Sequence, residues 1–299
     1  MSDPAVWSFE AIGTRWEIET GRPLPADARE AVTAAIADFD RTWSRFRDDS
    51  LVARLAASGG AEPLPADAAA MLDAYVELSR ATAGAVNPLV GDALARRGYD
   101  AGLSLRDRGA EPAPPDWPDL LSWSGGVLAL ARSATIDVGA LGKGRLVDLV
   151  ADALEPWAPG DLVVDASGDL RVRGAAVRVG LEHPYDARRA IGVVELRDAA
   201  LCASATNRRA WGDGLHHVLD ARTGEPVRAI AATWAIAPDA MRADAITTAL
   251  FFDGGPALAA AWGVEWVRMT TDGRVEWSPA CPAELFVAGD AGTTKGSQA

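Results

Sequence analysis

Two oxygen-bearing side chains, Asp244 and Thr248, form the first pattern in this chain that could bind a ligand. Residues four apart in a helix lie on the same face, so the carboxylate and the hydroxyl point the same way. Mg²⁺ prefers hard oxygen ligands of this kind and usually keeps several waters. An ordinary helix, with Asp244 in its first turn and Thr248 in the core, explains the same spacing.

A glycine-rich stretch, Asp137-Val-Gly-Ala-Leu-Gly-Lys-Gly144, is the second candidate site. It follows β-compatible residues over 135–138 and precedes apolar residues at helical spacing over 145–154, which predicts a strand, a glycine turn and a helix. Backbone N–H groups in such a turn, the positive end of the helix and Lys143 favour an anionic ligand, most simply a phosphate or pyrophosphate. The spacing is not that of a Walker A loop, and a purely structural turn is the alternative.

Two of the three histidines, His216 and His217, are adjacent. Neighbouring side chains on a strand point to opposite faces, so one imidazole can enter a cleft while the other meets solvent. His217 is a candidate catalytic residue, with Asp220 as the group that fixes its orientation. The alternative is a structural histidine that hydrogen bonds to Asp220 or to a turn.

The composition excludes several classes of protein. The net charge of −13, from 29 basic and 42 acidic residues, would repel a nucleic acid backbone, and an anionic ligand would need a local positive site. The two cysteines and three histidines have no zinc-ligand spacing. A basic leader and a run of 18 apolar residues are both missing from the sequence, so we expect a protein that is not membrane-inserted and is cytoplasmic.

The remaining pattern predicts one domain over residues 1–288 and a disordered tail over 289–299. Apolar residues at helical spacing alternate with short β-rich segments separated by glycine turns, which indicates an α+β fold with mainly antiparallel sheets. The predicted helices cover 28–43, 66–83, 145–154, 243–252 and 256–262. The predicted strands lie within 6–20, 162–174, 177–181, 191–196, 201–206, 233–237, 265–270 and 275–278.

A set of short motifs, taken in order, resembles the ApbE family, the flavin transferases that move FMN from FAD to proteins. The resemblance extends from about Gly13 to about Phe286. The motifs are Gly13-Thr-Arg-Trp16, Trp43-Ser-Arg-Phe46 with Asp49-Ser50, Gly84-Ala-Val-Asn-Pro88 with Val90-Gly91, Asp137–Gly144 with Asp148, Asp165-Ala-Ser-Gly-Asp169, His217-Val-Leu-Asp-Ala-Arg-Thr-Gly224 and Ala243-Asp-Ala-Ile-Thr-Thr-Ala249.

The resemblance implies an ApbE-like, T-fold-related architecture in which helices flank antiparallel sheets and FAD lies in a cleft between two lobes. It also implies a site in which Mg²⁺ bridges the FAD pyrophosphate to the protein. His217 falls on the motif histidine of the family. By motif position, the metal ligands are Ala140 (through its carbonyl), Asp244 and Thr248, and Thr247 beside them is a further possible ligand. The residues that contact FAD by motif position are Ile12, Phe46, Ala85, Val86, Asn87, Asp137 and Lys143.

The implied reaction is Mg²⁺-dependent transfer of FMN from FAD to a Thr or Ser hydroxyl of an acceptor protein with an FMN-binding domain, with release of AMP. Hydrolysis of FAD to FMN and AMP, and storage of FAD without turnover, are the alternatives. Four residues depart from the family pattern: Ser167 and Ala205 each replace a usual glycine, Ala221 a usual proline, and Asn87 a common aspartate.

Overall fold

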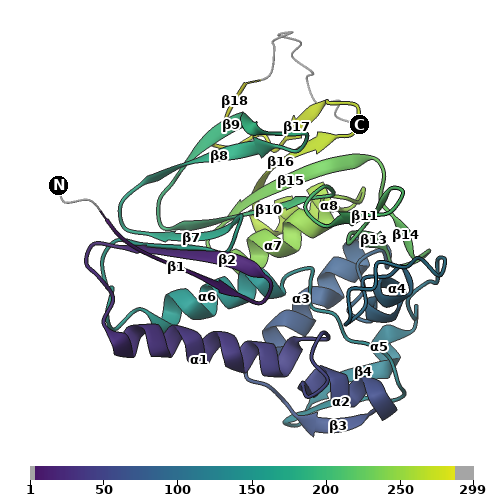
Figure 1. Ribbon diagram of the computed structural model, residues 1–299. Coiled ribbons are helices and arrows are strands. Elements are labelled where there is room, and N and C mark those ends of the chain that lie inside the picture. The colour runs from purple at the N-terminus through teal and green to yellow at the C-terminus, as the bar shows by residue number, and fades with distance from the viewer. Residues whose placement is uncertain (1–3, 287–299) are drawn as a thin grey trace.

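An eight-stranded sheet runs through the centre of the computed structural model, which describes residues 4–286 (Figure 1). Every neighbouring pair in the order β1-β2-β6-β7-β10-β15-β16-β17 is antiparallel, as predicted. The strands are β1 (Ala5–Ala11), β2 (Thr14–Thr20), β6 (Leu162–Asp165), β7 (Asp169–Arg173), β10 (Ala199–Ala205), β15 (Ile230–Ala237), β16 (Glu265–Thr270) and β17 (Val275–Trp277).

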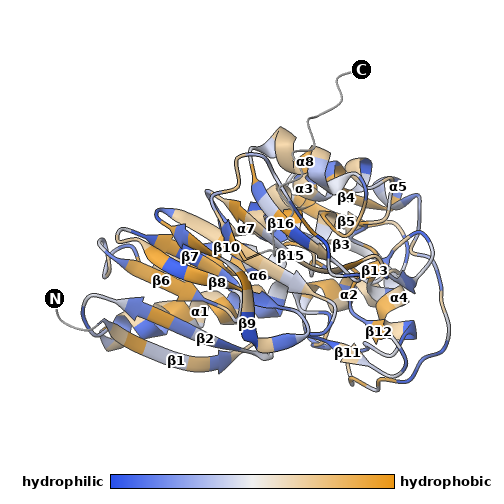
Figure 2. Ribbon diagram, turned by 90° about the horizontal axis from the view of Figure 1, so that it is seen from above, coloured by the Kyte–Doolittle hydropathy of each residue, from blue (hydrophilic) through white to orange (hydrophobic). Residues whose placement is uncertain are grey.

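A second, three-stranded sheet covers one face of the central sheet (Figure 1). It has the order β18-β9-β8, from β8 (Val177–His183), β9 (Asp186–Leu196) and β18 (Glu284–Leu285). The apolar side chains between the two sheets include Leu201, Trp234 and Val267. The middle strands are therefore buried on both faces, whereas hydrophilic and hydrophobic residues alternate along β1 and β2 at the edge (Figure 2).

Helices cover the opposite face of the central sheet and form the larger core. Five apolar residues of α7 are buried, and this agrees with its place against both the sheet and α6. The helices of this layer are α1 (Ala26–Trp43), α3 (Ala68–Ala81), α6 (Gly142–Ala153), α7 (Ala240–Ala249) and α8 (Gly255–Trp262).

Short elements beside α3 and around the 210–226 segment complete the fold (Figure 1). A small sheet of order β3-β5-β4 packs with α2, and two short hairpins, β11–β12 and β13–β14, follow β10. The bounds are α2 (Leu51–Ser58), β3 (Gly60–Pro63), α4 (Gly91–Arg96), α5 (Trp117–Leu120), β4 (Leu121–Ser124), β5 (Val127–Leu130), β11 (Ala210–Trp211), β12 (Leu215–His216), β13 (Leu219–Asp220) and β14 (Glu225–Pro226).

The predicted strand before the glycine turn is wrong. Residues 133–138 have no regular secondary structure and pair with no strand. Instead, Asp137 N donates to Pro88 O, and Thr135 is held by the Asp92 carboxylate. The apolar residues that suggested a strand are explained by burial, because Ile136 is fully buried among helices.

The predicted tail over 289–299 lies outside the described residues. In residues 4–286, no helix has the length and apolar character needed to cross a membrane.

Candidate active site

The N-termini of α6 and α7 pack directly against each other and form the frame of the site. A Cβ atom at Gly144 would lie 2.1 Å from Ala240 O, so only glycine allows this approach. The Asp148 carboxylate on α6 accepts hydrogen bonds from the N–H groups of Ala240 and Met241, both at 2.9 Å. In return, Gly144 N donates to Asp244 Oδ2 at 2.9 Å. Each helix therefore satisfies free N–H groups of the other.

The three predicted metal ligands meet at this junction. Thr248 Oγ1 donates to Ala140 O at 3.1 Å, and Asp244 lies one helical turn before Thr248. Asp244 is 4% exposed, and burial, followed by repulsion from Asp169, raises its pKa to about 8. Burial disfavours the ionised form of this carboxylate, and a bound cation would offset that cost. One carboxylate, one hydroxyl and one carbonyl oxygen are ligands that suit Mg²⁺.

The Thr247 hydroxyl makes its hydrogen bonds elsewhere in the protein. Its hydroxyl donates to Asp244 O at 2.7 Å and lies 3.0 Å from Ser204 Oγ, so it links α7 to β10. Within residues 4–286, no group of three or more His, Cys, Asp or Glu side chains is placed to hold a metal ion.

Lys143 reaches the same junction from the first turn of α6. Its Nζ lies 3.1 Å from Asp169 Oδ2 and 3.3 Å from Ala166 O. Burial lowers the pKa of Lys143, but the charges of Asp169 and Asp244 outweigh it and raise the pKa above its usual value. The ammonium group is therefore charged, and a quarter of the side chain remains exposed for an anionic ligand.

Asp137 lies beside the site, but its carboxylate contacts other groups of the protein. Arg45 Nε lies 2.5 Å from Asp137 Oδ2, and Gly139 N donates to Oδ1 at 2.7 Å. The buried Tyr75 hydroxyl donates to Asp137 O and accepts from Ala140 N. Asp137 and Tyr75 thus fix the loop that presents the Ala140 carbonyl.

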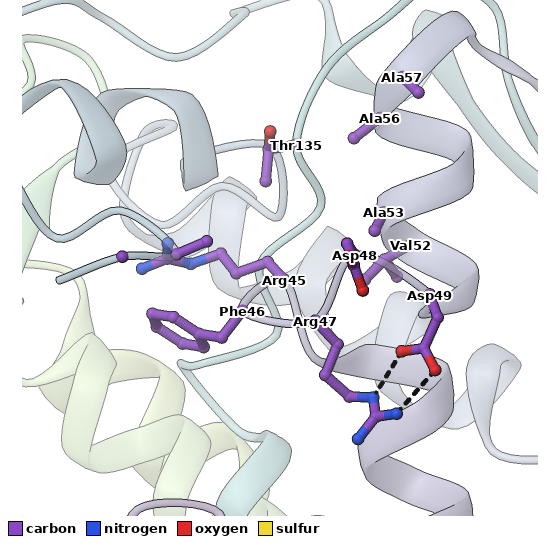
Figure 3. A pocket seen from close by; sticks show the side chains of 12 residues that line it. Arg45, Phe46, Arg47, Asp48, Asp49, Val52, Ala53, Ala56, Ala57 and Thr135 are labelled. Atoms are coloured by element: carbon purple, nitrogen blue, oxygen red, sulfur yellow. Dashed lines mark hydrogen bonds and ion pairs between the residues drawn. The ribbon is translucent and has the colours of Figure 1, made fainter.

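An open cavity of about 880 Å³ adjoins Arg45 and Phe46 (Figure 3). Arg45 and Phe46 line one side, and α2 presents Ala53 and Ala56 from the other (Figure 3). Phe46 is 42% exposed, and the Arg45 guanidinium lies 4.2 Å from the centre of its ring. An exposed aromatic ring beside a cation offers a stacking surface for a planar ligand.

A row of aromatic rings continues from Phe46 toward the β11–β12 hairpin. Tyr99 lies edge-on to Phe46 at 5.4 Å between ring centres, and it stacks on Trp211 at 5.6 Å. The row therefore connects the wall of the cavity to the hairpin that precedes His217.

Ile12 occupies the turn between β1 and β2 in a strained conformation. Its φ is +47°, followed by Gly13 at +73°, which are the values of a tight hairpin turn. A β-branched residue rarely adopts a positive φ, and Ile12 is nonetheless 37% exposed. Such strain at an exposed apolar residue is typical of ligand contacts.

The predicted FAD-binding segment Ala85–Asn87 is buried and tied to two other loops. Asn87 Nδ2 donates to Pro114 O at 2.9 Å, and Leu89 N donates to Asn87 Oδ1. Ala221 N donates to Ala85 O at 3.0 Å, and Ala113 N donates to Ala221 O at 2.8 Å. The Asn87 side chain therefore has a structural role here.

Three of the departures from the family pattern have structural consequences. Asn87 donates a hydrogen bond that an ionised aspartate cannot make, and Ala221 uses an N–H group that proline lacks. Ser167 has φ +56°, the left-handed conformation that favours glycine, and its hydroxyl donates to Arg15 O at 2.8 Å. The structure gives no account of Ala205.

His216 is buried, whereas His217 is partly exposed. His216 is the structural one, because its Nε2 bonds to Val227 O at 2.9 Å and its Nδ1 accepts from Val218 N. His217 Nδ1 is buried and has no hydrogen-bond partner in the described part of the chain. Burial, with a smaller effect of the Arg209 charge, lowers the pKa of His217 to about 3, so the imidazole is neutral.

Asp220 does not orient His217. Its carboxylate receives three hydrogen bonds from the guanidinium group of Arg222, at 2.6 to 3.2 Å, and one from Arg222 N. The predicted role fails because Arg222, two residues away on the same turn, takes up both carboxylate oxygens.

Three residues of the site were not singled out from the sequence: Arg45, Tyr75 and Asp169. Asp169 is fully buried, and neither of its carboxylate oxygens makes a hydrogen bond in the described part of the chain besides the ion pair with Lys143. The Asp165–Asp169 motif contained the signal for Asp169, but nothing in the sequence pairs it with Lys143.

One protein family matches most of the sequence. The family model of the ApbE family matches residues 12–267, and the chain therefore belongs to this family. Among relatives, the FAD:protein FMN transferase of Rhodobacter capsulatus is 28% identical over 303 residues, which cover 93% of this chain and 58% of the relative. The chain thus spans little more than half of that protein. The FAD:protein FMN transferase of Treponema pallidum is 28% identical over 81% of this chain and 77% of the relative.

Solved structures support the same fold. The ApbE protein of Thermotoga maritima has a TM-score of 0.80 and 20% identity, covering 93% of this chain and 97% of that one. The apo form of the flavinyl transferase ApbE from Pseudomonas stutzeri has a TM-score of 0.75 and 23% identity, covering 93% and 96%. The α+β, ApbE-like fold predicted from the sequence is confirmed.

Proposed function

We propose that this chain transfers FMN from FAD to a Thr or Ser hydroxyl of an acceptor protein and releases AMP, in a reaction that requires Mg²⁺. The observation that carries the proposal is the meeting of Ala140 O, Thr248 Oγ1 and the buried Asp244 carboxylate beside Lys143. The names of the relatives, FAD:protein FMN transferase, support the choice of reaction.

The residues would divide the work as follows. Ala140, Asp244 and Thr248 would hold Mg²⁺, which supplies positive charge next to the FAD pyrophosphate. Lys143 and the free N–H groups at the start of α6 would bind the phosphate oxygens. Phe46 and Ile12 would pack against the apolar rings of FAD.

The bond changes require one proton transfer. The acceptor hydroxyl oxygen forms a bond to the FMN phosphorus, the bond from this phosphorus to the AMP oxygen breaks, and AMP leaves with the electron pair. We assign the hydroxyl proton to the neutral His217 imidazole, whose Nδ1 makes no other hydrogen bond in the described residues. Positioning and charge stabilisation supply most of the rate in such reactions, and a base adds about 10²–10⁴-fold.

A gel assay tests the proposal. The purified chain is incubated with FAD, Mg²⁺ and a small FMN-binding acceptor domain, and the denatured products are scanned for covalent flavin fluorescence. We expect a fluorescent acceptor band that EDTA abolishes. AMP release with no labelled acceptor would instead indicate FAD hydrolysis, and FAD binding with neither product would indicate a storage protein.

A further inference from the structure

The ion pair between Lys143 and Asp169 joins two segments that are distant in the sequence. Lys143 lies in the first turn of α6, and Asp169 is the first residue of β7. Lys143 Nζ lies 3.1 Å from Asp169 Oδ2, and the Asp169 side chain is 1% exposed. Within residues 4–286, neither oxygen of this carboxylate has a further hydrogen-bond partner. The buried carboxylate is therefore dedicated to Lys143.

The turn between β6 and β7 supplies a second partner for the ammonium group. Lys143 Nζ donates to Ala166 O at 3.3 Å. The turn itself is held by hydrogen bonds, since Ala166 N donates to Asp169 O at 2.9 Å and Gly168 N donates to Asp165 Oδ1 at 3.0 Å. Both partners of the ammonium group therefore belong to one fixed turn.

The hydrogen bonds of the ammonium group leave one donor for a ligand. An ammonium group has three N–H donors, and Lys143 directs two of them to Asp169 and Ala166. A quarter of the Lys143 side chain is exposed. The next residue, Gly144, donates its N–H group to Asp244, the proposed metal ligand. The ammonium group is thus held beside the proposed metal site with one N–H group available.

The chemistry of Asp169 does not fit a role in attracting an anion. Its charge offsets that of Lys143, so the pair sums to zero and attracts a phosphate less than Lys143 alone would. A purely structural role is also a poor fit, because apolar side chains of similar volume often stabilise a protein as well as a buried ion pair does. What the carboxylate supplies is a fixed place for a charge that otherwise sits on a long, flexible side chain.

We propose that Asp169 is a positioning residue, which fixes the Lys143 ammonium group at one place beside the pyrophosphate of FAD. This inference rests on the proposed function. Lys143 stays protonated throughout, and the bonds that form and break are those given above. A misplacement of about 1 Å can slow a reaction about 10²-fold, so Asp169 acts on the rate more than on the affinity.

The test compares D169N, K143M and the double variant K143M/D169N. The control is D161N at the other end of the β6–β7 hairpin, where the Asp161 carboxylate accepts from Ala175 N. The rate is measured as AMP release from FAD with Mg²⁺ and the acceptor domain. Calorimetry with inorganic pyrophosphate and Mg²⁺ gives the affinity and counts the folded sites.

We expect D169N to lower kcat per folded site about 10- to 10²-fold, because the ammonium group loses its fixed position. D169N should neither raise KM for FAD nor weaken pyrophosphate binding, because the variant also removes a negative charge. K143M should lower both kcat and the pyrophosphate affinity. Adding D169N to K143M should lower kcat no further, and D161N should stay within about 2-fold of wild type.

The proposal is overturned if D169N keeps the kcat of wild type, or if D169N lowers kcat by the same factor with and without Lys143. If D169N binds no pyrophosphate because it does not fold, K143M/D169N is compared with K143M. An equal kcat then supports the proposal, and a further loss overturns it. AMP release is common to transfer and hydrolysis, so a wild-type chain that labels no acceptor would overturn the proposed function while the test of Asp169 still holds.

Discussion

Replacing His217 by asparagine should change how the stability of the protein depends on pH. In the folded chain burial lowers the His217 pKa to about 3, whereas the unfolded chain has the ordinary value of 6.5. The unfolded state therefore binds more protons below pH 6.5, and the folded state loses stability as the pH falls from 6.5 toward 3. A pH of 5 lies about 1.5 units below the pKa of the unfolded state. The folded protein should therefore be about 2 kcal/mol less stable at pH 5 than at neutral pH because of His217.

The measurement is urea unfolding of wild type and H217N at pH 8 and at pH 5, with EDTA present. Between these two pH values wild type should lose about 2 kcal/mol more free energy of unfolding than H217N. The free energy of unfolding at pH 8 is the internal control, because His217 is deprotonated there in both the folded and the unfolded state. Equal losses in the two proteins would refute the claim that the folded chain holds His217 as the neutral imidazole.

Three further substitutions test the frame of the site. G144A should destabilise the protein by about 3 kcal/mol or more, because its Cβ would clash with Ala240 O at 2.1 Å, while the control G160A, with no atom within 4 Å, should leave the thermal midpoint unchanged. N87D should lower the free energy of unfolding at pH 7 by about 1–2 kcal/mol, since an ionised aspartate cannot donate to Pro114 O; an unchanged urea midpoint would contradict this role. Y75F should lower the free energy of unfolding by about 1–2 kcal/mol in the same measurement, because the hydroxyl links Asp137 O to Ala140 N. It should also weaken Mg²⁺-dependent FAD binding. Unchanged FAD affinity would show that Tyr75 does not position the loop for ligand binding.

Local signals in the sequence predicted the α+β class, and the family resemblance predicted the ApbE-like fold. Alternating strands and apolar helical spacing predicted the antiparallel sheet and α6 to α8. The segment over 135–138 was predicted wrongly because a buried irregular segment and a buried strand can share the same apolar composition. Only the presence of a neighbouring strand distinguishes the two, and the spacing of apolar residues along the sequence does not show which segments are neighbours.

The candidate site was predictable where its residues are close in sequence or belong to a motif. Asp244 and Thr248 share a helix, and the glycine loop brings Ala140 and Lys143 to them. Asp169 and Arg45 reach the site through contacts between distant segments, so spacing gave no signal for them. The error at Asp220 had a local cause, since Arg222 competes for the same carboxylate.

The most direct test of the central claim is the mass of the acceptor domain after incubation with FAD, Mg²⁺ and either wild type, D244N or D239A. D244N keeps the shape of the proposed metal ligand and removes its charge. D239A removes the side-chain cap of the same helix, which accepts from Arg242 N at 2.8 Å, and serves as the control for helix stability. We expect wild type and D239A to add one FMN to the acceptor and D244N to leave it unmodified. An FMN adduct formed by D244N at the wild-type rate would contradict the assignment of Asp244 as the metal ligand on which transfer depends.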